Sequence, residues 1–405
     1  MSPLDFVPSL EALRANRNLL QPFLVTLRRH LHQHPEIGFS EHETAALLKR
    51  ILTALGGGRL HTGKGGGTGM WIDIDSTNPS VGEQGIRLAY RADIDALPLD
   101  DLKSTSYRSS VAGAAHLCGH DAHTTMAIGV AMLAMASADT LPFHLRVFFQ
   151  PNEEGTPSGA PMMIEDGVLE GIQAVWGSHV DPTLRVGTYG LIPGPSSASF
   201  DQFDIEVEVA GSGHSARPHL NGDAIWLLLQ LLQQAYTLPG RITDARLPAS
   251  FTVTRLKGSD AYNGTPKVAW AGGTLRCLDV SVRETLKSRL SHLTAELGPL
   301  HGGQIRLTWT EGAPPVINDR RLTEEMREAL SGALGTSSVV DVPLPSMGGE
   351  DFAHYGLLKP AILLRVGTAS GPDTEHALHD GRFDIDESVL APTAEIILKA
   401  MALHV

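Results

Sequence analysis

Four apolar segments of this chain each run into acidic or imidazole side chains. The segments have the character of buried strands and span residues 87–92, 143–149, 174–178 and 361–366. The polar residues that follow them are, in chain order, Asp93 with Asp95, Glu153 with Glu154, His179, and His376 with His379. Open α/β sheets carry their functional groups beyond the carboxyl ends of the strands. The sequence therefore predicts an α/β sheet with a site along one edge.

A second cluster of chemically active side chains lies at residues 118–123, which read Cys-Gly-His-Asp-Ala-His. An apolar helical run at 126–133 follows directly, so the cluster is placed at a helix entrance, where the helix dipole favours a thiolate. Thiolate and imidazole together bind zinc and neighbouring divalent metals. A lone cysteine is more often a small buried apolar residue. The two histidines close to Cys118 make a metal site the better interpretation.

Two pairs of acidic residues are also consistent with a metal site at the ends of strands. Glu153 and Glu154 lie between an apolar strand and a Gly/Pro turn, where one carboxylate can bind metal while its neighbour transfers protons. Asp93 and Asp95 end another strand, and either can bind metal or orient a ligand histidine. Solvated turn acids are the alternative for both pairs.

Five motifs occur in order along the chain. They are HLHQHPEIG at 30–38, RADIDALP at 91–98, CGHDAHT at 118–124, QPNEEG at 150–155 and GHSARPH at 213–219. Together they resemble the bimetal amidohydrolase/carboxypeptidase family that includes hippurate hydrolases, indole-acetyl-amino-acid hydrolases and N-acetyl-diaminopimelate deacetylases. The resemblance spans residues 27 to 387 and implies hydrolysis of the amide bond of an N-acyl amino acid. A dipeptidase or carboxypeptidase is the alternative, followed by a non-catalytic metal- or ligand-binding protein.

The resemblance also implies roles for individual residues. The metal ligands it implies are Cys118, His120, Glu154, His179 and His379. Five ligands are more than one tetrahedral zinc ion binds and suit two divalent ions. These ions are expected to be Zn²⁺ or Mn²⁺, with Ni²⁺ or Co²⁺ as alternatives. Glu153 is implied as the general base that takes a proton from the metal-activated water and delivers it to the leaving amine. Asp95 matches an aspartate that orients a ligand, whereas Asp93 lies where distant relatives have a metal histidine, so its role stays open.

Further residues are implied at the substrate. His214 matches a histidine that stabilises the oxyanion, commonly in the site of the neighbouring subunit, with His219 as second choice. Arg276 matches an arginine that binds the substrate carboxylate. Asn263 is a match too, but Gly264 and Thr265 replace the residues that many relatives have after it, which leaves specificity open. The histidines at 30, 32 and 34 are expected to be structural, on a helix with its leucines facing inward.

The length of 405 residues predicts two domains. We expect residues 1–191 and 312–405 to form the catalytic metal-binding domain, a mostly parallel sheet flanked by helices. Residues 192–311 are expected to form an inserted α+β lid or dimerisation domain of order β-α-β-β-α-β, entered through a hinge at 187–199. Its strands are expected near 203–209, 250–257, 267–278 and 304–310, and its helices near 223–237 and 282–297. Exposed strand edges there predict a homodimer or a dimer-based oligomer.

The composition excludes some classes of binding partner and some cellular locations. A net charge of −13 argues against nucleic acid and anionic membranes as partners and leaves a small molecule as substrate. Two cysteines provide no disulfide framework, and a thiolate ligand requires reducing conditions. No secretory signal pattern and no apolar run of membrane-spanning length is recognisable. We therefore expect a cytoplasmic enzyme.

Overall fold

The computed structural model describes residues 3–405 and divides them into two compact units. Unit 1 comprises the chain up to Gly194 together with Ile317–Pro343 and His354–Val405. Unit 2 comprises Pro195–Val316 and Leu344–Ala353. The second unit therefore includes a short return segment that the sequence analysis had placed in the catalytic domain. That segment joins unit 2 because the backbone N–H of Ala198 donates to the carbonyl oxygen of Ser346.

Unit 1 is built on an eight-stranded sheet of order β1-β2-β4-β3-β5-β16-β6-β15. Its strands are β1 (Arg59–Lys64), β2 (Gly69–Ile74), β3 (Arg87–Asp93), β4 (His144–Gln150), β5 (Ile172–Arg185), β6 (Tyr189–Leu191), β15 (Val339–Asp341) and β16 (Ala361–Ala369). The four central strands β4, β3, β5 and β16 run parallel, so their carboxyl ends meet at one edge. Asp93 on β3 pairs with Gln150 on β4 at that edge. The expected fold class is confirmed.

Helices cover both faces of this sheet. They are α1 (Leu10–Ala15), α2 (Leu20–Gln33), α3 (His42–Leu55), α4 (His120–Ala136), α5 (Gly159–Glu165), α9 (Arg320–Leu334), α10 (Ala353–Gly356) and α11 (Leu390–Leu403). Helix α4 is buried along its whole length because its side chains are apolar on nearly all sides, and it packs between the sheet and helices α2 and α11. On the opposite face of β4, the ring of Phe148 packs against Tyr355 of α10.

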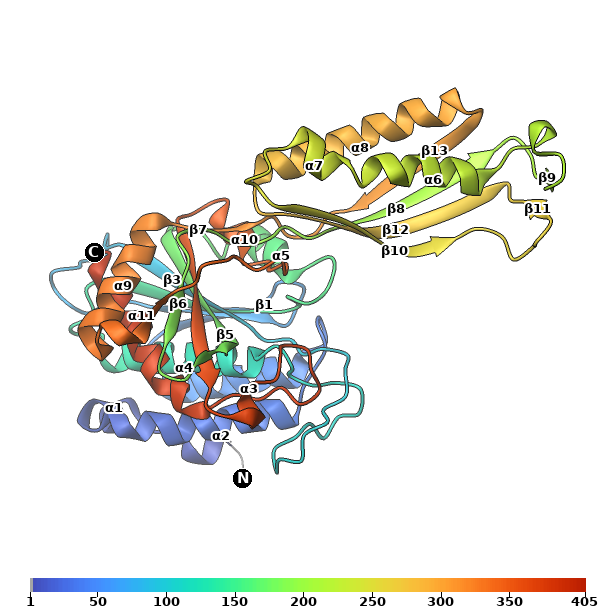
Figure 1. The fold of residues 1–405 in the computed structure, drawn as a ribbon. Helices are drawn as coiled ribbons and strands as arrows, with labels where there is room; N and C mark the ends of the chain where they lie inside the picture. The colour runs from blue at the N-terminus through green and yellow to red at the C-terminus, as the bar shows by residue number, and fades with distance from the viewer. Residues whose placement is uncertain (1–2) are drawn as a thin grey trace. The chain divides into compact units, whose positions relative to one another are not determined.

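Unit 2 has a core of its own beneath an antiparallel sheet of order β10-β12-β8-β13. The strands are β8 (Asp201–Val209), β10 (Ala249–Lys257), β12 (Val268–Cys277) and β13 (Gly303–Thr310). Helices α6 (Ala224–Ala235), α7 (Leu238–Ile242) and α8 (Val280–Leu300) lie along one face (Figure 1). Burial alternates along β8, as its sequence predicts. The predicted strands and helices are all present, and the short strands β9 (Gly213–His214) and β11 (Gly264–Thr265) add a hairpin-like pair.

The segment predicted as a hinge is more regular than expected. Residues 187–199 contain β6 and a further short strand, β7 (Gly194–Ser197). The reason is pairing, because β6 lies between β16 and β15 and completes the edge of the unit 1 sheet. Across residues 3–405, none of the helices combines the length and the apolar character needed to cross a bilayer.

Candidate metal centre and active site

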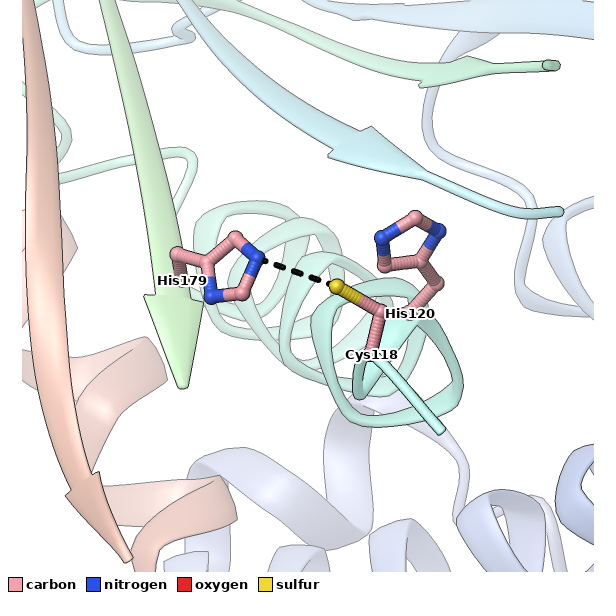
Figure 2. A group of neighbouring side chains, drawn as sticks. All are labelled: Cys118, His120 and His179. Carbon is pink, nitrogen blue, oxygen red and sulfur yellow. Dashed lines mark hydrogen bonds between the residues drawn. The ribbon is translucent and has the colours of Figure 1, made fainter. Parts of the chain in front are cut away.

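Cys118, His120 and His179 converge at the entrance of α4 (Figure 2). Cys118 precedes Gly119, which caps the helix in a left-handed conformation with φ of 88°. His120 is the first helical residue, and His179 comes from β5. Nε2 of His179 points at Sγ of Cys118 across 3.5 Å. Nδ1 of His179 donates to the carbonyl oxygen of Val180, so its Nε2 lone pair faces the cluster.

A second group of ligand atoms shares the same thiol. Those of Cys118, Glu154 and His379 all lie within 4.8 Å of one another, as do those of the first group. Nε2 of His379 is 3.2 Å from Oε1 of Glu154. His379 has a positive φ of 67°, and its backbone N–H donates to the carbonyl oxygen of Leu117. The structure thus brings together all five residues that the family resemblance implied as ligands.

The contacts of His120 indicate that this cluster suits a cation. Its Nδ1 lies 3.0 Å from the carbonyl oxygen of Asp95 and therefore carries the proton. Its Nε2 is buried, has no hydrogen-bond partner within residues 3–405, and lies 3.8 Å from Asp93, 3.9 Å from Glu153 and 4.0 Å from Glu154. A buried, unpaired nitrogen surrounded by carboxylates is costly unless something binds it. Thiol, imidazole and carboxylate donors fit divalent metal ions.

The surrounding carboxylates also control protonation. Burial alone lowers the pKa of His120, but Asp93 and Asp95 outweigh burial and raise that pKa to about 10. Burial raises the pKa of Cys118 well above its ordinary value, and the charges of Glu154 and Glu153 raise it further. The expectation that the helix entrance favours a thiolate is therefore wrong for the metal-free protein, because burial and negative charge outweigh the dipole. The thiol would lose its proton when a metal binds.

Glu153 lies beside these ligand atoms. Its carboxylate is within 4.8 Å of the ligand atoms of His120 and Glu154, and about a tenth of its side chain is exposed. A carboxylate in this position can reach a water molecule that enters the site. The geometry is compatible with the division of labour expected for Glu153 and Glu154.

Asp95 and Asp93 have different contacts. Oδ1 of Asp95 is 3.1 Å from Nδ1 of His120, and Oδ2 accepts the backbone N–H of Glu154 at 3.0 Å. Asp93 uses one oxygen for Nη1 of Arg91 at 2.6 Å and the other for Nδ1 of His123 at 2.8 Å. These contacts favour a role for Asp93 in holding its neighbours, and they address the question that its sequence position left open.

His123 was singled out in the sequence as part of the metal-binding cluster. Both of its ring nitrogens are engaged, because Nε2 accepts the N–H of Val180 at 3.0 Å while Nδ1 donates to Asp93. Its ring packs against that of His179 with centroids 4.6 Å apart. Burial lowers the pKa of His123 to about 4, so the ring is neutral. We interpret His123 as a support for the β5 segment that carries His179.

The substrate-binding candidates lie in unit 2 at two separate places. Pairing of β9 with β11 places His214 opposite Gly264, next to Asn263. Arg276 lies near the far end of β12, with its guanidinium 4.7 Å from the ring centroid of Phe200 and its Nη1 donating to the carbonyl oxygen of Met347. The structure brings His214 and Asn263 together within unit 2, but not Arg276 with either of them.

Arg28 and Glu41 are buried charged residues that the sequence analysis did not single out. Arg28 donates to Asp121 and to Asp384, each at 2.8 Å, and thereby ties α2 to the start of α4. His32, expected to be structural, is fully buried, and its Nδ1 lies 2.7 Å from Asp121. Glu41 is also fully buried, although its polar surroundings in the sequence gave no signal of this.

Comparison with known sequences identifies the family. Residues 89–403 match the sequence model of peptidase family M20/M25/M40. The chain belongs to this family. Membership confirms the resemblance drawn from the motifs and makes the protein a metal-dependent hydrolase, as the ligand cluster also indicates.

Individual M20-type relatives match almost end to end. The N-acetyl-L-cysteine deacetylase of Bacillus subtilis is 36% identical over 94% of this chain and 88% of its own length. Thermostable carboxypeptidase 2 of Saccharolobus solfataricus is 30% identical over 94% of this chain and 95% of its own length. A crystal structure of a dinuclear metal-binding M20 peptidase from Bacillus subtilis superposes with a TM-score of 0.81 at 29% identity, covering 96% of this chain and 98% of that one.

Proposed function

We propose that this protein hydrolyses the amide bond of an N-acyl amino acid at a site holding two divalent metal ions. The observation that carries the proposal is the pair of ligand groups that share Cys118, one with His120 and His179 and the other with Glu154 and His379. The relative described as a dinuclear metal-binding peptidase supports two ions. The donor set favours Zn²⁺, with Mn²⁺, Ni²⁺ and Co²⁺ as alternatives.

In the proposed reaction, different residues of the chain have different roles. When bound, the two ions would polarise the substrate carbonyl and lower the pKa of a water molecule. Glu153 would accept the proton from the attacking water and donate it to the leaving amine nitrogen. Asp95 would keep His120 in the tautomer whose Nε2 faces the site.

Two kinds of relative suggest two kinds of leaving group. A deacetylase among them favours removal of a small acyl group from an amino acid. A carboxypeptidase among them supports the alternative, cleavage of a peptide bond by the same groups. In both cases the leaving amine carries a carboxylate, for which the guanidinium of Arg276 is a suitable bidentate partner.

A substrate panel tests this proposal. Acetyl, benzoyl and indole-acetyl amino acids should be cleaved with higher kcat/KM than simple dipeptides, and the best of them should then be compared with its methyl ester. Loss of a charge-assisted hydrogen bond worth roughly 1.5–3 kcal/mol predicts a decrease of about 10- to 150-fold for the ester. Arg276→Ala should lower kcat/KM similarly for the acid and far less for the ester. Faster cleavage of dipeptides would favour the carboxypeptidase alternative.

We further propose a homodimer formed through unit 2. Leu256 on edge strand β10, Leu229 on helix α6 and Tyr236, directly after α6, are exposed apolar side chains. Val268 and Arg276 lie eight residues apart on β12, a span of about 26 Å at the ~3.3 Å rise of a strand, and Asn263 precedes Val268. A single small substrate therefore cannot contact Arg276 and His214 of the same unit 2. A partner subunit would supply one of them.

The expected cytoplasmic location remains part of the proposal. Its support is chemical, because a ligand thiol such as Cys118 must stay reduced to bind metal. Cys118 and Cys277 are both free in the structure.

A further inference from the structure

The residue before the proposed general base has an unusual backbone. Asn152 directly precedes Glu153 and has a positive φ of 50°. Within residues 3–405, the non-glycine residues with positive φ are Phe39, Asn152 and His379. Such a conformation is uncommon for a residue with a Cβ and persists where the surroundings enforce it. Two of these three residues are a proposed metal ligand and the neighbour of the proposed base.

Three hydrogen bonds hold Asn152 in this conformation. Its backbone N–H donates to Oε1 of Glu41 at 3.0 Å, and its carbonyl oxygen accepts the N–H of Gly159 at 2.9 Å. Its side-chain amide donates to the carbonyl oxygen of Pro157 at 2.7 Å. Glu41 is itself fixed, because its other oxygen accepts the hydroxyl of Thr68 at 2.7 Å and its side chain is fully buried. The backbone N–H, the carbonyl oxygen and the side-chain NH2 group of Asn152 are thus all engaged.

Two glycines pack closely against the side-chain amide of Asn152. Gly38 and Gly155 lie so close to this amide that a Cβ on either glycine would collide with the amide oxygen. Close approach to Asn152 therefore accounts for the glycine at both positions. The amide group is enclosed by parts of the chain more than a hundred residues apart.

A second buried acid holds the other side of Glu153. The backbone N–H of Glu154 donates to Oδ2 of Asp95 at 3.0 Å. The Glu153–Glu154 peptide group is therefore anchored by Asp95, and the Pro151–Asn152 peptide group, one peptide before the Asn152–Glu153 linkage, is anchored by Glu41. The backbone of Glu153 has little freedom between these two anchors.

From this geometry we infer that Glu41 and Asn152 are positioning residues for Glu153. They hold the strained turn that aims its carboxylate at the metal-binding cluster, and neither is a ligand or a proton donor in the reaction. The inference rests on the proposed function, in which Glu153 is the general base. Displacement of a reacting group by about 1 Å can cost on the order of 100-fold in rate, so loss of either contact should be visible in kcat.

The test compares Asn152→Ala, Glu41→Ala and Glu41→Gln in the full-length, zinc-loaded enzyme. Asn152→Ala and Glu41→Ala should lower kcat by about 10- to 100-fold. KM and the number of bound zinc ions should stay close to wild type, whereas the thermal midpoint should fall in Asn152→Ala and Glu41→Ala because buried polar groups lose their partners. Glu41→Gln keeps an oxygen for the N–H of Asn152 and should retain kcat. Glu43→Ala, an exposed glutamate two residues away, is the matched control and should change nothing.

A double-mutant cycle distinguishes an effect of Glu41 that acts through Glu153 from a non-specific structural effect on the enzyme. In a Glu153→Gln background the base is absent, so adding Glu41→Ala should cause no further decrease in kcat. A purely structural role would give the same fractional loss in both backgrounds. Additive losses, or wild-type kcat in Asn152→Ala and Glu41→Ala, would overturn the inference. Full kcat in Glu153→Gln alone would instead refute the proposed function, so the two failures are distinguishable.

A steric variant provides independent evidence if Asn152→Ala does not fold. Gly38→Ala should push the Asn152 amide aside and lower kcat. In the double variant Gly38→Ala/Asn152→Gly the amide is gone and glycine tolerates the positive φ, so kcat should rise to that of Asn152→Gly. A Gly38→Ala enzyme with wild-type kcat, or a double variant no better than Gly38→Ala, would contradict the inference.

Discussion

Asp95 serves two residues of the proposed metal site with its two carboxylate oxygens. Oδ1 lies 3.1 Å from Nδ1 of His120, and Oδ2 accepts the backbone N–H of Glu154 at 3.0 Å. One buried side chain therefore sets the ring orientation of one proposed ligand and the backbone position of another. Partners of this kind fix the tautomer of a ligand histidine and raise its basicity.

Asp95→Ala should weaken metal binding while leaving the ligands themselves in place. Loss of such a partner typically costs 10- to 100-fold in metal affinity, so we expect zinc affinity to fall by about that factor. Competition with a chromophoric chelator measures it directly. Asp100→Ala, which changes an exposed aspartate on the same loop, is the control. Equal affinities for Asp95→Ala and wild type would contradict the role assigned to Asp95.

Zinc binding should be strongly pH dependent. Burial and the charges of Glu154 and Glu153 raise the pKa of Cys118, so the thiol is protonated in the metal-free protein at neutral pH. Binding must displace that proton, and affinity should rise about tenfold per pH unit for each proton released. Calorimetry in buffers of different ionisation enthalpy counts the protons. Cys118→Ala should release one proton fewer than wild type, and an unchanged count would show that Cys118 is not a ligand.

Arg28 should be far more important for stability than its neighbour Arg29. Arg28→Met removes the buried guanidinium that pairs with Asp121 and Asp384, and breaking a buried pair in this way costs about 3–5 kcal/mol. Arg29 is half exposed and pairs with Glu387, so Arg29→Met should cost less than about 1 kcal/mol. Urea unfolding of the metal-free variants gives both free energies. Similar losses in the two variants would refute this account of the network.

The proposed dimer predicts complementation between inactive subunits. Glu153→Gln lacks the base and His214→Ala lacks the proposed oxyanion donor, so each homodimer should have low kcat. If His214 acts in the site of the partner subunit, mixing the two variants should restore activity in half of the sites of a heterodimer. Absence of recovery, with subunit exchange verified by mass spectrometry, would indicate that His214 acts within its own subunit. Leu229→Asp should shift the protein toward monomer in analytical ultracentrifugation.

The sequence alone predicted the strands, and the site residues that lie within recognisable local motifs. The apolar and alternating patterns of strands such as β16 and β8 are visible in the sequence. The ligand candidates lie at the start of α4 (Cys118, His120), within β5 (His179), and in the loops that follow β4 and β16 (Glu154, His379). Glu41 could not be found in this way. It lies among polar residues in a segment without periodicity, and only the fold brings it to the N–H of Asn152, more than a hundred residues along the chain.

The protonation state of site residues was the second property that could not be predicted from the sequence. The position of Cys118 before a helix predicts a lowered pKa, but burial reverses this effect, and the charges of Glu154 and Glu153 in the loop after β4 add to the rise in pKa. The same holds for Asp93, whose two oxygens are taken by Arg91 and His123. Burial and contacts with residues distant in sequence determine the pKa of Cys118 and the role of Asp93. Burial and such contacts cannot be predicted from the local sequence.

The central claim is that Glu153 transfers protons while Glu154 binds metal, and one paired measurement tests it. Zinc content by atomic emission and kcat should be determined for Glu153→Gln and Glu154→Gln purified side by side. We predict that Glu153→Gln keeps two zinc ions and loses on the order of 100-fold or more in kcat, the usual scale of general acid–base catalysis. Glu154→Gln should bind less than two equivalents. Equal zinc loss in both variants, or full kcat in Glu153→Gln, would contradict the account.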